Sequence, residues 1–175
     1  MNLSAAMAIT LISVFLTGCI QYIARNLHMG EPARYPEDSW IKHGEARAEI
    51  RKALLECGMP STQADQFVYE KALGLKNSDD VLNHVLSTHA CMENSDYVYW
   101  RKSTFADYCL IYRDKQLPVC QPNAVIPQRN VETRLNSWLC KIKTDREYCR
   151  KHAFTPSACN DPKKDYDNPP PECRP

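Results

Sequence analysis

The chain begins with an uncharged apolar run and continues with segments in which apolar positions recur at helical spacing. Residues 5–16 carry no charged side chain. This run is shorter than the roughly 20 residues that a membrane-spanning helix needs, and it matches the apolar region of a secretion signal. The opening pattern therefore predicts an exported protein.

Three helical patterns follow in succession. Apolar residues recur within 46–57, 64–72 and 81–89 as they do on one face of a helix. Gly58 and Gly74 follow the first two segments as stop signals. The residues expected to face the core are Ala46, Ile50, Ala53, Leu54, Cys57, Ala64, Phe67, Val68, Ala72, Val81, Leu82, Val85, Leu86 and His89.

Two more helices are expected farther along the chain. The pattern predicts a short one over 104–113 and a clearer one that begins after Asn130 as its cap. The inward residues of the second are Val131, Leu135, Trp138, Leu139 and Ile142. Residues 97–100 form the single strand-like run, which is too isolated to build a sheet. We therefore predict an all-α fold class, with a small irregular helical domain.

The cysteines and prolines add covalent staples to this picture. Of nine cysteines, eight remain when Cys19 is set aside, and an even number in a short exported chain predicts a disulfide framework. The eight are Cys57, Cys91, Cys109, Cys120, Cys140, Cys149, Cys159 and Cys173. Nine of the twelve prolines lie at or after Pro118, so we expect a Pro-rich, loop-like carboxy-terminal part. Up to four disulfides would staple the whole helical domain.

A repeat in the spacing favours two of the bridges. Cys109 and Cys149 each follow a tyrosine, and each precedes a second cysteine that is flanked by prolines. If the first cysteine ends a helix and the second lies in a returning loop, Cys109 pairs with Cys120 and Cys149 with Cys159. The spacing leaves open how the other four pair among themselves: Cys57, Cys91, Cys140 and Cys173.

The apolar run ends at Leu16-Thr17-Gly18-Cys19, which is a leucine, two small residues and a cysteine. This segment resembles the lipobox of bacterial lipoproteins. The resemblance implies cleavage before Cys19, diacylglycerol on its sulfur and acylation of its amine, which together would anchor the protein to a membrane. An uncleaved signal anchor over 3–24 is the alternative, because the first basic side chain, Arg25, follows the cleavage point.

Two further features bear on location. An Asp after the lipidated cysteine typically retains Gram-negative lipoproteins at the inner membrane, so Ile20 implies the outer membrane, on its periplasmic or its surface-exposed face. The segment 40–44, Trp-Ile-Lys-His-Gly before a helix that ends in cysteine, is similar to the opening of small cysteine-rich Gram-negative lipoproteins. That similarity implies no activity.

These features predict the organisation of the chain. We expect a signal peptide at 1–18, a lipidated cysteine and tether at 19–39, and a disulfide-rich helical domain at 40–162. A Pro-rich tail at 163–175, stapled through Cys173, would complete it.

The charge balance and the motifs indicate no cofactor and no catalytic residue. Lys and Arg number 22 against 21 Asp and Glu, so the net charge of +1 offers no field that would attract nucleic acid. The best metal candidates are His84, His89 and Cys91, but the spacing puts the two histidines on diverging helix faces, and we expect no metal ion. Asp79 and Asp80 suit a helix start better than acid–base chemistry.

The most suggestive binding surface is Tyr97, Tyr99 and Trp100 beside Arg101, because aromatic side chains and arginine are enriched in interaction hot spots. The alternative, which we favour, is that these rings fill the core. We expect a non-catalytic binding or scaffolding lipoprotein with a membrane anchor and an envelope protein as its partner. There are two alternative hypotheses: an inhibitor of an exported hydrolase, such as a lysozyme, and an envelope enzyme.

Overall fold

Helices make up most of residues 36–62 and 66–175, which are the residues that the computed structural model describes. The α-helices of this part are α2 (Arg47–Glu56), α3 (Gln66–Leu73), α4 (Ser78–Glu93), α5 (Phe105–Ile111), α6 (Val131–Leu135), α7 (Trp138–Thr144) and α8 (Arg146–His152). The short 3-10 helices are η1 (Pro36–Ser39), η2 (Arg113–Lys115), η3 (Pro118–Cys120), η4 (Pro156–Asn160) and η5 (Pro171–Cys173). The prediction of a small, mostly helical domain is confirmed. The signal segment, Cys19 and Ala64 lie outside the described residues.

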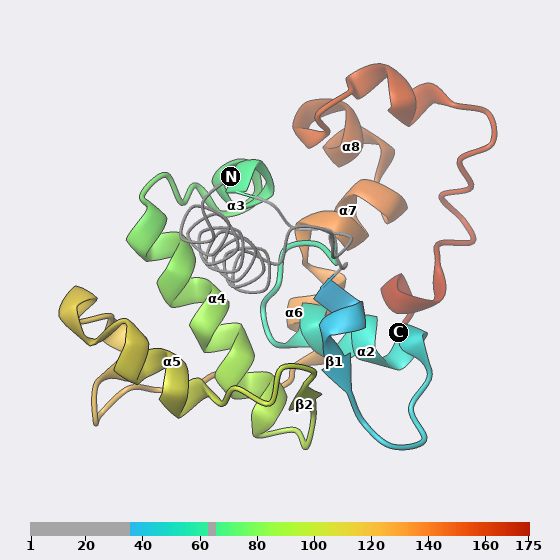
Figure 1. Cartoon of the computed structure of the whole chain (residues 1–175). Helices are drawn as coiled ribbons and strands as arrows, with labels where there is room; N and C mark the ends of the chain where they lie inside the picture. Colours follow the sequence, from blue (N-terminus) through green and yellow to red (C-terminus); the bar gives the residue numbers. More distant parts are fainter. Residues whose placement is uncertain (1–35, 63–65) are drawn as a thin grey trace, which may run out of the picture. The chain divides into compact units, whose positions relative to one another are not determined.

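The longest described helix, α4, packs against α5 and α2 (Figure 1). It begins at its cap Asn77, whose side-chain oxygen accepts a hydrogen bond from the Asp79 N–H at 2.8 Å. Leu86 and His89 are buried on its inner face, as the pattern predicts. The main core cluster joins the end of α4 to α2 and to Trp40, so these elements fold around shared apolar side chains.

A two-stranded sheet corrects the prediction that residues 97–100 are too isolated to build a sheet. Strand β2 (Val98–Tyr99) lies antiparallel to β1 (Trp40–Ile41), with Trp40 opposite Tyr99. Each strand has only two residues, so neither shows the alternation from which a strand is predicted. The pairing fixes the start of the domain against the chain that follows α4.

The single helix predicted after Asn130 is in fact two. Asn130 caps α6, as expected, but α6 ends at Leu135 and Ser137 caps a new helix, α7. The Ser137 hydroxyl accepts a hydrogen bond from the Cys140 N–H at 3.3 Å. Asn136 and Ser137 compete with helical hydrogen bonds through their own side chains, which favours a cap over a helix interior.

Three residues expected in the core are exposed instead. Ala46 lies at the amino-terminal cap of α2, before the helix begins to pack. Phe67 is 72% exposed because the next two residues of α3, Val68 and Tyr69, take the buried side. Val131, at the first position of α6, is 48% exposed. The helical pattern therefore locates these helices more accurately than it orients their ends.

Four disulfides staple the domain. The two favoured pairs, Cys109 with Cys120 and Cys149 with Cys159, are confirmed. The remaining cysteines pair as Cys57 with Cys91 and Cys140 with Cys173. The first of these joins α2 to α4 in the main core, and the second ties η5 to α7.

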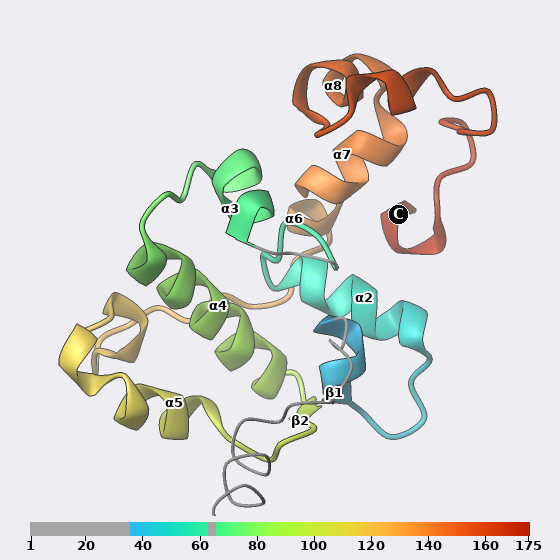
Figure 2. The same ribbon diagram turned by 45° about the horizontal axis from the view of Figure 1, so that its top comes forward.

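The Pro-rich carboxy-terminal part consists of short 3-10 turns and irregular chain. Figure 2 shows the segment after α8 running back to the vicinity of α2. There η5 packs against both α2 and α7. Because residues 161–170 contain no helix, the end of the chain is held by the contacts of η5 and by the Cys140–Cys173 bridge.

Candidate functional site

A pocket of about 340 Å³ lies between α4, α5 and the two short strands. Its aromatic lining residues are Trp40, Tyr69, His89, Tyr99, Tyr108 and Tyr112, and aliphatic side chains of α2 and α4 supply much of the rest. No Asp, Glu, Lys or Arg is among the described residues that line it. Its volume lies at the lower end of the roughly 300 to 1,000 Å³ that is typical of small-molecule sites.

His89 sits within a cage of aromatic rings in the wall of this pocket. Its ring centroid lies 4.6 Å from that of Trp40 and 5.1 Å from those of Tyr99 and Tyr108. The residue is only 6% exposed. Pairing of β1 with β2 brings Trp40 and Tyr99 together, and α5 adds Tyr108, so the cage is built from four separate parts of the chain.

His89 is neutral at physiological pH. Burial lowers the pKa of its imidazole to about 4. The nearest carboxylate oxygen, Glu93 Oε1, is 3.4 Å from His89 Nδ1, and the contact is no charged pair because the ring is uncharged. Glu93 Oε1 instead accepts a hydrogen bond from the Phe105 N–H at 2.9 Å. Within the described residues, neither ring nitrogen of His89 has a hydrogen-bond partner.

Tyr69 also lines this pocket, and its hydroxyl is a second buried polar atom. The residue is 3% exposed, and its hydroxyl has no hydrogen-bond partner in the described part of the chain. Burial raises the pKa of this hydroxyl to about 12, so it remains protonated. A buried polar atom without a partner costs about 1 to 3 kcal/mol, and such atoms call for a specific explanation.

The structure distributes the predicted binding residues over different surroundings. Tyr97 is 2% exposed and belongs to the main core, where its hydroxyl donates to Glu45. Tyr99 is half-buried and lines the pocket. The Arg101 guanidinium lies 4.6 Å from the ring centroid of the half-buried Trp100. Tyr97 is therefore a core residue, and Tyr99 is the member of the set that the pocket includes.

The structure also places the three residues weighed as metal ligands. Cys91 is bonded to Cys57, and His84 Nε2 donates to the Gly58 carbonyl oxygen at 2.9 Å. His89 lies in the aromatic cage described above. Over the described ranges, no three His, Cys, Asp or Glu side chains are grouped so that they could hold a metal ion.

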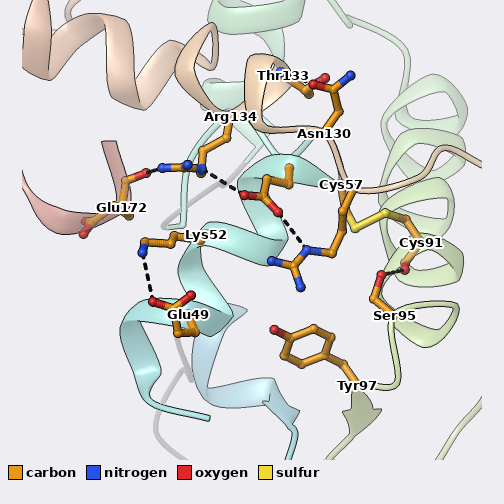
Figure 3. Close-up of polar contacts among 12 residues, drawn as sticks. Glu49, Lys52, Cys57, Cys91, Ser95, Tyr97, Asn130, Thr133, Arg134 and Glu172 are labelled. Atoms are coloured by element: carbon orange, nitrogen blue, oxygen red, sulfur yellow. Dashed lines mark hydrogen bonds and ion pairs between the residues drawn. A yellow bond between two sulfur atoms is a disulfide. The ribbon is translucent and has the colours of Figure 1, made fainter. Parts of the chain in front are cut away.

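A buried ionic network lies outside the pocket lining (Figure 3). Glu56, at the end of α2, accepts hydrogen bonds from Arg129 at 2.7 Å and from Arg134 at 3.0 Å. Arg134 also donates to the carbonyl oxygens of Glu172, at 2.8 Å, and of Arg174. The network links α2, α6 and η5, and its hydrogen bonds run within the fold, which makes it structural.

The sequence pattern did not reveal the pocket. The pattern predicts that His89 faces the core, but it does not predict that His89, Tyr69, Tyr108 and Tyr112 line one pocket. The spacing of Tyr108 and Tyr112, which places both on one side of a helix, was the available signal for part of the wall. Nothing in the sequence indicates that Trp40 packs against His89.

Within the described ranges, every helix falls short of the length and apolar character that crossing a membrane requires. Comparisons with family models, with curated proteins and with solved structures find no match to this chain.

Proposed function

We propose that the chain is a lipid-anchored protein of the bacterial cell envelope whose disulfide-stapled domain acts by binding. The disulfide pairing is the observation that carries this proposal. The chain has nine cysteines, and the four bridges use eight of them. The cysteine left over is Cys19, which stands at the end of the lipobox-like segment.

The compartment follows from the same cysteines. Disulfides form and persist in oxidising spaces such as the bacterial periplasm and are rare in the cytosol. A domain with four bridges therefore suits a chain whose opening resembles an export signal. With Ile20 after the lipidated cysteine, the outer membrane is the proposed address, on either its periplasmic or its surface-exposed face.

Binding is the activity that the site supports best. The pocket is apolar, and its described lining residues include no carboxylate. The two polar groups in this described lining that lack a partner, His89 and Tyr69, are both neutral. Catalysis of the acid–base kind is favoured by groups whose pKa lies near the working pH. The pKa of His89, at about 4, and that of Tyr69, at about 12, both lie far from neutrality. We therefore propose a binding or scaffolding role with an envelope partner and without chemistry.

Replacement of Cys19 by serine tests the anchor. The variant should either leave the membrane fraction for the soluble fraction or keep its signal peptide uncleaved, because serine offers no thiol for the lipid. The matched control is Thr17→Ser, which keeps a small residue in the same segment and should remain membrane-bound and processed. Fractionation and immunoblotting measure both. A Cys19→Ser protein that is processed and membrane-bound like the wild type would contradict the proposal.

A further inference from the structure

The pocket beside α4 combines an apolar wall with two polar groups that the fold leaves unpartnered. Most of its described lining is aromatic or aliphatic. His89 and Tyr69 are each more than nine-tenths buried, and their polar side-chain atoms have no hydrogen-bond partner in the described residues. A small-molecule site is usually a concave apolar surface with a small number of polar groups that converge on the ligand.

The charge of the wall restricts what can enter. Since no Asp, Glu, Lys or Arg is among the described lining residues, a charged guest would lose its hydration without gaining a partner of opposite sign. The aromatic cage does not serve a cationic guest either, because the ring of His89 already occupies it. A guest of this pocket would therefore be uncharged.

The unpartnered groups indicate which polar atom the guest carries. A neutral imidazole offers one donor and one acceptor, and a tyrosine hydroxyl offers the same pair of roles. A hydroxyl group matches both, since it too can donate and accept. The rings of Trp40, Tyr99 and Tyr108 offer faces and edges that favour an aromatic body.

We propose that this pocket binds an uncharged aromatic alcohol of phenol size, with its hydroxyl group hydrogen-bonded to His89 or Tyr69. This inference rests on the proposed binding function and names the ligand class of that function. The hydroxyl supplies a partner that the fold withholds, and the ring displaces water from the apolar wall.

Three probes of one shape test the ligand class: p-cresol, p-xylene and p-toluate. Titration calorimetry of the purified mature protein, with its detergent alone as the blank, measures their affinities. p-Cresol should bind about tenfold more tightly than p-xylene, which lacks the hydrogen bond. p-Toluate should not bind, because its carboxylate would be buried without a partner. Binding of p-toluate as tight as that of p-cresol would overturn the proposal, as would the absence of binding by all three probes.

Two conservative variants locate the hydrogen bond. His89→Phe and Tyr69→Phe keep a ring in place and remove the polar atoms, and the double variant should bind p-cresol and p-xylene equally well. The single variants show which residue holds the hydroxyl. The control is His152→Phe, whose ring stacks on Tyr148 outside this pocket and whose loss should leave the tenfold preference unchanged.

The outcomes separate this inference from the function on which it rests. A preference for p-cresol that survives in the double variant overturns the assignment of the pocket. A protein that binds no probe, while Cys19→Ser still releases it from the membrane, overturns the ligand class and leaves the anchor in place.

Discussion

Arg134→Met should lower the free energy of unfolding by about 3 to 5 kcal/mol, which is the cost of breaking a buried ion pair from one side. The Arg134 and Glu56 side chains are only 4% and 8% exposed. Without Arg134, the one cationic partner that the described residues still offer this buried carboxylate is Arg129, which is itself 30% exposed. The carbonyl oxygens of Glu172 and Arg174 lose their donor in the same step, which loosens η5 from α6.

Urea unfolding of two further variants of this protein shows whether the effect of Arg134→Met comes from the buried ion pair. Arg150→Met removes the same charge from an exposed position of α8, and its effect should stay within about 0.5 kcal/mol. The double variant Arg134→Met with Glu56→Met removes both buried charges and should recover much of the lost stability. An Arg134→Met protein as stable as the Arg150→Met protein would show that the network in Figure 3 does not hold the domain together.

Removal of the Cys57–Cys91 bridge, with both cysteines changed to alanine, should cost about 4 kcal/mol. The bridge closes a loop between residues 34 positions apart, and both cysteines lie in the main core. A longer loop gains more freedom in the unfolded chain when its bridge is removed.

The Cys109–Cys120 bridge is the matched comparison, because its cysteines are only 11 positions apart and both are half-buried. Its removal should cost about 3 kcal/mol by the same loop-closure relation. Urea midpoints of the two double variants, measured under oxidising conditions that keep the other bridges, give the order. If removing the short-loop bridge lost more stability than removing the long-loop bridge, loop closure would not be the main source of the stability that these bridges add.

The sequence predicts those parts of the fold that are governed by neighbours along the chain. Asn77 and Asn130 cap helices because a side-chain oxygen can reach backbone N–H groups two or three residues away. The two short bridges were likewise visible in local spacing, since each spans only 10 or 11 positions. The break at Ser137 is not predicted, because apolar spacing continues across it.

The features set by distant contacts could not be predicted in the same way. The pairing of Trp40 with Tyr99 joins two strands too short to show a pattern. The pocket depends on that pairing and on the packing of α3 and α5 against α4, so its described wall comes from six regions of the chain. The sequence shows residues 97–100 only as its one strand-like run, and the fold is needed to show that Tyr97 enters the core while Tyr99 enters the pocket wall.

The intact mass of the protein from the membrane fraction, before and after reduction, tests the central claim most directly. We predict a chain that begins at Cys19 and carries lipid, and whose mass rises on reduction by two hydrogen atoms for each of the four bridges. A protein that retains residues 1–18, or whose mass is unchanged by the reductant, would contradict the account of an exported and lipid-anchored disulfide domain.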